Sequence, residues 1–170
     1  MANLFLMCGV PGSGKSTFLK NYVTIEDGKC VIISRDEIRL SLLKEGEEYF
    51  SHEDEVVKIF WEKINNALAA GYDVFVDQTS INPRSRKWLL DHINGYDEVI
   101  AIWINTTLRN CIKNNENRKG TNKYAPIDTI INMKEKFVKP SFNEEFSKIY
   151  CYNTKTNTLS YKENNKNDNR

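Results

Sequence analysis

The chain has no excess of either charge and no long apolar run, and each absence excludes a class of protein. Of its 170 residues, 24 are Lys or Arg and 23 are Asp or Glu, so the net charge is +1. This near-neutrality excludes a uniformly basic nucleic-acid coat, while a local basic patch remains compatible with it. No apolar stretch has the roughly 20 residues that a membrane-spanning helix needs, and no charged leader precedes the first apolar residues. We therefore expect a soluble, cytoplasmic protein with no membrane partner.

Cysteine is also scarce. The four cysteines stand at positions 8, 30, 111 and 151, and no two of them form a Cys-x-x-Cys pair. This spacing is typical of buried, reduced thiols in a reducing cytosol. The length of the chain suits a single α/β domain with a sizeable core.

The most informative feature that is present is a glycine-rich segment directly after the apolar run Leu4–Met7. It reads Gly9-Val10-Pro11-Gly12-Ser13-Gly14-Lys15-Ser16, which is the P-loop pattern Gly-x-x-x-x-Gly-Lys-Ser/Thr. Its glycines allow a tight turn whose N–H groups converge on one point, and the helix expected over Ser16–Tyr22 adds the partial positive charge of its N-terminus. Lys15 is placed to bind the outer phosphates and Ser16 to bind a magnesium ion. The segment predicts a nucleoside triphosphate site; the alternative is a merely structural turn.

Short apolar runs alternate with helical patterns along the chain. Strands are expected over Leu4–Cys8, Cys30–Ser34, Asp73–Asp77, Glu98–Ile104 and Lys148–Tyr152. Helices are expected over Ser51–Ala70 with Ser51 as its cap, Pro83–Asn94, Thr107–Asn117 and Pro126–Phe137. This alternation predicts an α/β fold: a parallel sheet of the P-loop kinase type with helices on both faces. Ligands of such sheets bind beyond the carboxyl ends of the strands.

A carboxylate and an arginine follow the second expected strand. Asp36 and Arg39 are three residues apart at a helix start, so they share one face of that helix. A carboxylate aimed into the cleft can act as a general base toward a phosphoryl acceptor, and the arginine can hold an anionic acceptor. The alternative is a capping Asp with an exposed Arg.

Asp77 closes the third expected strand, near the P-loop. An Asp in this place suits the magnesium shell or the orientation of the acceptor. The alternative is that Asp77 only caps the turn into the next helix. We expect Arg84 and Arg86, which follow on that helix, to lie on the surface, although either could reach an acceptor.

The segment Arg109–Pro140 is locally basic, with eight Lys or Arg against three Asp or Glu. Within it, residues 118–123 interrupt two expected helices with charged residues and a glycine. Such a break suits a mobile helical lid that closes on nucleotide phosphates. Arg118 is then placed to act in cis as an arginine finger on the transferring group. The alternative is a solvated loop.

These elements together resemble the kinase domain of bacteriophage and bacterial polynucleotide 5′-hydroxyl kinases. The resemblance covers about residues 3–150. It rests on the P-loop with Thr17, on Ser-Arg-Asp-Glu-Ile-Arg at 34–39, on Asp77 ahead of Asn82-Pro83, on Arg118 with Gly120-Thr121, on Pro126-Ile127-Asp128, and on Phe137-x-x-Pro140 before Glu144-Glu145-Phe146. The P-loop alone is unspecific, whereas its combination with Asp-x-x-Arg and the later pieces is much more specific.

The resemblance implies transfer of the γ-phosphoryl group of ATP to a 5′-OH end of DNA or RNA. The implied catalytic residues are Lys15, Asp36 and Arg118. Asp36 would activate the hydroxyl, Arg39 would contact the acceptor's phosphate and Asp77 would support the acceptor. Ser16 would hold Mg²⁺. The implied ATP-binding residues are Gly9, Pro11, Gly12, Ser13, Gly14, Lys15, Ser16, Thr17 and Arg118.

The chain departs from the family pattern in three ways. Members often carry a second Arg four residues before the lid Arg, where this chain has Asn114, so donor binding would depend more on Lys119 or Lys123. Spacing differs by one residue after Asp77 and by one within the lid. Members also often carry a phosphatase or ligase domain. Here the kinase domain is expected over 1–152, followed at 153–170 by a polar tail expected to be disordered. The 3′-phosphatase or ligase steps would then need separate partners.

Two other functions fit the same motifs. A P-loop kinase of a small-molecule hydroxyl would use the same Asp base, and a nucleotide-binding switch would use the P-loop alone. The basic segment favours the polynucleotide kinase over both, because nucleic-acid contacts need charge directed at phosphates. DNA or RNA as substrate, ATP or GTP as donor, and monomer or homo-oligomer remain open from the sequence.

Overall fold

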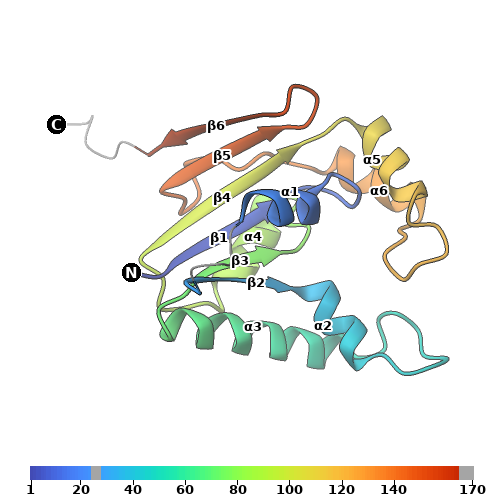
Figure 1. The fold of residues 1–170 in the computed structure, drawn as a ribbon, viewed down its shortest axis with the longest axis horizontal. Helices are drawn as coiled ribbons and strands as arrows, with labels where there is room; N and C mark the ends of the chain where they lie inside the picture. Colours follow the sequence, from blue (N-terminus) through green and yellow to red (C-terminus); the bar gives the residue numbers. More distant parts are fainter. Residues whose placement is uncertain (24–27, 165–170) are drawn as a thin grey trace.

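Six strands form one sheet in the computed structural model, which describes residues 1–23 and 28–164 (Figure 1). The strands are β1 (Asn3–Cys8), β2 (Cys30–Ser34), β3 (Asp73–Asp77), β4 (Glu98–Asn105), β5 (Lys148–Asn153) and β6 (Thr158–Glu163). Their order across the sheet is β2-β3-β1-β4-β5-β6. The first five run parallel and β6 pairs antiparallel with β5. The predicted α/β fold is confirmed.

Helices lie on both faces of the sheet and beyond its carboxyl end (Figure 1). They are α1 (Lys15–Tyr22), α2 (Arg35–Leu42), α3 (Glu53–Ala69), α4 (Pro83–Leu90), α5 (Leu108–Glu116) and α6 (Ile127–Glu135). Among the described residues, none of these helices combines the length and hydropathy needed to cross a bilayer.

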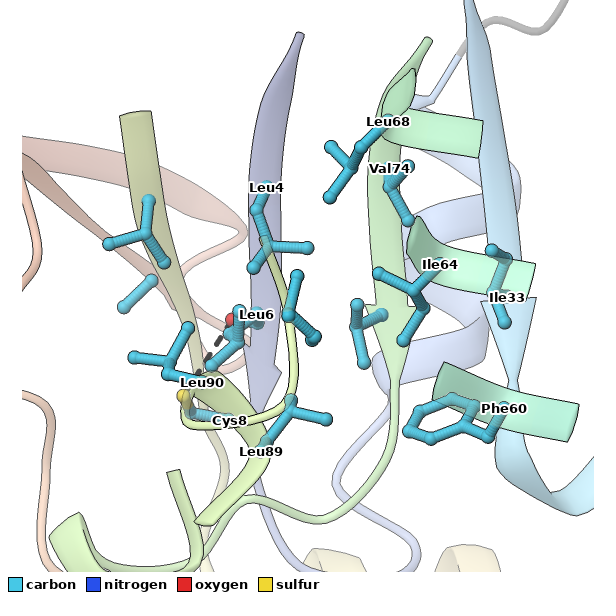
Figure 2. Packing of buried hydrophobic residues seen from close by; sticks show 14 of the residues in the cluster. Leu4, Leu6, Cys8, Ile33, Phe60, Ile64, Leu68, Val74, Leu89 and Leu90 are labelled. Atoms are coloured by element: carbon cyan, nitrogen blue, oxygen red, sulfur yellow. Dashed lines mark hydrogen bonds between the residues drawn. The ribbon is translucent and has the colours of Figure 1, made fainter. Parts of the chain in front are cut away.

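Alternate residues of the central strands supply two cores. Leu4 and Leu6 of β1 pack with Phe60 and Ile64 of α3 and Leu89 of α4, as Figure 2 shows. On the opposite face, β1 and β4 pack against α1 in a second, smaller cluster. Strands covered on both faces read as nearly continuous apolar runs, which is why the sequence located them well.

Side-chain capping is present at the starts of α2, α4 and α5, and the start of α3 corrects one prediction. The Ser34 hydroxyl accepts from the Glu37 N–H at the start of α2, and Asn82 forms a capping box with Ser85 around Pro83 at the start of α4. Ser51 does not cap α3. Its hydroxyl donates to the Glu48 carbonyl instead. The N-cap of α3 is His52, one residue after the predicted cap, and the first turn of the helix carries three acidic residues.

The predicted disordered tail is wrong for the residues that the structure describes. Residues 153–163 complete a hairpin in which β6 extends the sheet, so the boundary predicted at 152 falls inside this structural unit. Asn157 takes a left-handed conformation in the turn, and Tyr161 stacks on Tyr150 with ring centroids 5.4 Å apart. The alternation of Leu159 and Tyr161 was hidden by the polar composition around it. The predicted disorder of residues 165–170 lies outside the described residues.

Arg86 is not on the surface, contrary to expectation. Its side chain is fully buried and forms a bidentate pair with Glu144, with Nε–Oε2 and Nη2–Oε1 distances of 2.6 and 2.9 Å. Its Nη1 also donates to the carbonyls of Ser80 and Val138. Arg86 therefore ties the chain after β3 to the segment after α6. Arg84, by contrast, is exposed.

Replacing Arg86 is expected to destabilise the fold. In Arg86→Met, Glu144 keeps its charge in a mostly buried place without its partner, and breaking one side of such a pair costs about 3–5 kcal/mol. Urea unfolding monitored by circular dichroism measures the change in the free energy of unfolding, and Arg84→Met is the matched control. A loss no larger than that of the control would contradict a structural role for Arg86.

Candidate active site

The P-loop lies between the carboxyl end of β1 and the start of α1, and the fold leaves little room around it. Gly12 has φ +77°, and a Cβ there would lie 2.2 Å from the carbonyl oxygen of Cys111. Gly14 is the N-cap of α1 with φ 102°, and no side chain caps the helix. The first N–H groups of α1 therefore keep their hydrogen-bonding capacity for an anion. This geometry fits a phosphate-binding loop.

Lys15, the first residue of α1, has its side chain buried against the P-loop that precedes it. Its Nζ donates to the carbonyls of Gly9 and Val10 at 2.9 and 3.1 Å. Burial lowers the pKa of Lys15, the charges of Asp77 and Asp36 oppose this, and the charge of Arg118 lowers it further. Three predicted site residues from three separate segments thus act electrostatically on Lys15.

Ser16 and Asp77 form a direct pair. The Ser16 hydroxyl donates to Asp77 Oδ2 at 3.0 Å, which joins the start of α1 to the end of β3. Hydroxyl and carboxylate oxygens are the donors that Mg²⁺ prefers. Within the described ranges, no three His, Cys, Asp or Glu side chains come together as a metal site. A magnesium ion at Ser16 and Asp77 would therefore share its coordination with the nucleotide's phosphates and water, as is usual for Mg²⁺.

A cavity of about 330 Å³ opens beside this pair. Its walls come from α1, β2, α2, the end of β3 and the lid segment, which is the stretch between α5 and α6. The lining residues are Ser16, Leu19, Lys20, Val23, Ile32, Ser34, Glu37, Asp77 and Lys123. Lys123 is the one contribution of the lid to this lining. Lys123 was predicted from the sequence to take part in donor binding, and that role stays a prediction.

Asp36 and Arg39 do meet, as their spacing predicted. Arg39 Nη1 donates to Asp36 Oδ1, and the Tyr49 hydroxyl donates to the same oxygen at 3.0 Å. The Asp36 side chain is 57% exposed and the Arg39 side chain only 7%. Asp36 is thus open to an incoming molecule, while Arg39 supports it from within.

Glu53 is a site residue that the sequence did not reveal. It accepts from Arg39 Nε and Nη2, both at 2.9 Å, and from Arg35 Nη2. Burial would lower the pKa of Arg39, but hydrogen bonds to Glu53 and Tyr49 outweigh it and hold that pKa above its ordinary value. Burial raises the pKa of Glu53, and the two arginines outweigh it and lower that pKa. Most of the hydrogen-bond donors of Arg39 are therefore used by partners within the protein.

The lid segment lies between α5 and α6, where the charged break predicted it. Arg118 is half-buried at the end of α5 and acts on Lys15 through its charge. Asn114, four residues before Arg118, donates from Nδ2 to the Gly12 carbonyl at 2.9 Å. Thr106, at the end of β4, donates to the Ser13 carbonyl at 2.7 Å. Asn114 and Thr106 thus brace the P-loop, a role that spacing alone did not indicate.

Comparison with known proteins bears on the family and the fold of the chain. A family model described as an AAA domain matches residues 4–140. The chain is similar to a chain in the Pnkp1/Rnl/Hen1 RNA repair complex, with 25% identity and a TM-score of 0.65 over 81% of this chain and 46% of that one. This chain therefore spans less than half the length of that relative.

Two further solved structures share the fold. One is a gluconokinase from Sinorhizobium meliloti 1021, with 17% identity and a TM-score of 0.58 over 89% of this chain and 82% of that one. The other is Chaetomium thermophilum Kti12 in complex with ADP-AlF3, with 12% identity and a TM-score of 0.65 over 89% of each chain. Both likenesses show that the chain shares the α/β fold of these proteins.

Proposed function

The chain belongs to this AAA domain family, and from that premise we propose that it is an ATP-dependent polynucleotide 5′-hydroxyl kinase. The observation that carries the proposal is the exposed Asp36 carboxylate, oriented by Arg39 and Tyr49 and close enough to Lys15 for its charge to act there. A carboxylate between a phosphate-binding lysine and open solvent suits a kinase that activates a hydroxyl acceptor.

The roles follow from the positions of the side chains. The acceptor's 5′-oxygen forms the new bond to the γ-phosphorus, its proton passes to Asp36, and the bond to ADP breaks. Lys15 would turn from the carbonyls of Gly9 and Val10 to the outer phosphates of ATP, where its charge offsets theirs. Ser16, with support from Asp77, would hold Mg²⁺, which would supply positive charge against the phosphates. Arg118 stabilises the charge on the transferring group.

Arg39 has a narrower role than the sequence predicted. Since Glu53, Asp36 and Tyr49 occupy four of its donor positions, at most one N–H on Nη2 remains for an acceptor phosphate. We therefore assign Arg39 chiefly to the orientation of Asp36, with a single hydrogen bond left for the acceptor.

The polynucleotide acceptor is supported by two observations. The segment between α5 and α6 carries Arg118, Lys119 and Lys123 within six residues, and contacts to nucleic-acid phosphates need such positive charge. The similar chain of 25% identity comes from an RNA repair complex. That likeness also suggests partners in RNA repair. A small-molecule hydroxyl remains the second candidate, because a gluconokinase has the same fold.

A labelling experiment tests the proposal. The protein is incubated with Mg²⁺, γ-labelled ATP and a 5′-OH oligonucleotide, and in parallel with the same oligonucleotide already carrying a 5′-phosphate. We expect label only on the 5′-OH strand, for DNA, RNA or both. Label on neither strand, with ATP bound or hydrolysed, would contradict the proposal and favour a small-molecule acceptor or a nucleotide switch.

A further inference from the structure

The segment between α2 and α3, residues 43–52, carries two adjacent aromatic side chains beside Asp36. Tyr49 and Phe50 meet edge to face, with ring centroids 4.9 Å apart and ring planes at 80°. Tyr49 is anchored because its hydroxyl donates to Asp36 Oδ1. Phe50 has no polar group to anchor it and is 66% exposed. Its ring is therefore available to a molecule that approaches Asp36.

Arg39 lies against both rings and helps to hold them in position. The guanidinium carbon lies 4.9 Å from the centroid of the Tyr49 ring and 4.9 Å from that of the Phe50 ring. A guanidinium at this distance attracts an aromatic ring. Because Glu53 holds Arg39 through two hydrogen bonds, the aromatic pair rests on a buried, fixed support. Because this surface is already held in place, little conformational entropy is lost when a ligand binds to it.

The aromatic pair also lies at the entrance that the proposed acceptor must use. Segment 43–52 projects from the carboxyl end of the sheet, the same end at which the segment between α5 and α6 projects (Figure 1). Asp36, Tyr49 and Phe50 form a continuous chain of contacts outward from the reacting carboxylate. An acceptor whose hydroxyl reaches Asp36 therefore places its next chemical group near Phe50.

We propose that Phe50 is the stacking surface for the base of the acceptor's 5′-terminal nucleoside, and that Tyr49 holds this surface beside Asp36. The proposal rests on the proposed function and names the part of the acceptor that is recognised. Every nucleobase has a planar π face, so the contact tolerates any sequence, and stacking of one base on an aromatic side chain is worth roughly 5- to 150-fold in affinity. It selects a nucleoside over an acceptor that has no planar ring.

The test compares two acceptors with two variants of Phe50. One acceptor is a 5′-OH oligonucleotide, and the other is the same strand with an abasic deoxyribose at its 5′ end. We expect Phe50→Ala to raise KM for the normal strand roughly 5- to 150-fold with little change in kcat, and to leave KM for the abasic strand unchanged. Phe50→Trp, which keeps an aromatic face, should restore the preference for the normal strand.

Tyr161→Ala is the matched control, because Tyr161 is 60% exposed on β6, outside the aromatic pair. A Phe50→Ala effect of equal size on both acceptors, or no effect on either, would overturn the stacking role. Failure of Phe50→Trp to restore the preference would do the same, since it would point to a shape requirement rather than a π face.

A binding measurement separates this inference from the proposed function. A 5′-OH strand with 2-aminopurine as its terminal base should lose fluorescence on binding to the wild type and keep it with Phe50→Ala. If the wild type phosphorylates neither strand but still quenches this probe through Phe50, the kinase proposal fails and the stacking surface stands. If Phe50→Ala quenches the probe as the wild type does, the stacking surface fails whatever the enzyme phosphorylates.

Discussion

Replacing Lys15 with alanine is expected to reduce kcat/KM for phosphoryl transfer by at least about 100- to 1,000-fold, the usual effect of removing one group that stabilises transition-state charge. The Lys15 ammonium is buried among the P-loop carbonyls, where it donates to Gly9 and Val10. The methyl group of alanine cannot reach the phosphates. Initial rates with labelled ATP and a 5′-OH strand measure the loss.

The control for this variant is Lys63→Ala. Lys63 is exposed on α3 and is not among the residues that line the cavity beside Ser16 and Asp77. Its replacement should leave kcat/KM within a few-fold of the wild type. Both variants should keep the thermal unfolding midpoint, because the carbonyls released by Lys15→Ala can accept from water. Near-normal turnover in Lys15→Ala would refute the assignment of this loop to the donor phosphates.

Asp36→Asn is expected to lower kcat by about 100- to 10,000-fold, the range for loss of a general base. The amide keeps the shape of the carboxylate and can still accept from Arg39 Nη1 and from the Tyr49 hydroxyl. What it loses is the capacity to take the proton of the attacking hydroxyl. Single-turnover rates with saturating ATP and acceptor isolate this chemical step from binding.

Asp54→Asn serves as the comparison, because Asp54 is an exposed carboxylate in the first turn of α3 and has no part in the proposed chemistry. A single-turnover rate for Asp36→Asn within a few-fold of that for Asp54→Asn would show that Asp36 is not the base. A fall in rate accompanied by a large rise in the acceptor's KM would instead indicate that Asp36 acts mainly through Arg39 and Tyr49.

Sequence and structure agree where the determinants are local. The P-loop, the five parallel strands and the break between α5 and α6 were predicted at nearly their observed positions. Each depends on neighbouring residues: glycines that accept positive φ, short apolar runs, and Gly120 within a charged turn. The prediction failed at β6, where Leu159 and Tyr161 alternate within a polar segment and form a strand only because β5 offers a free edge.

The sequence by itself determined the kind of fold and the phosphate loop, because glycine conformation, strand patterning and the order Gly-Lys-Ser act within a few residues of each other. Only the tertiary structure decided which distant side chains lie together. Glu53 accepts a hydrogen bond from Arg39, which is 14 residues away in the sequence. Arg86 donates to Glu144, 58 residues away, and the Ser16 hydroxyl donates to Asp77, 61 residues away. No local spacing encodes such pairs, since they depend on how the packed sheet and helices bring distant segments to one edge and on which carboxylate is close enough to satisfy each buried charge.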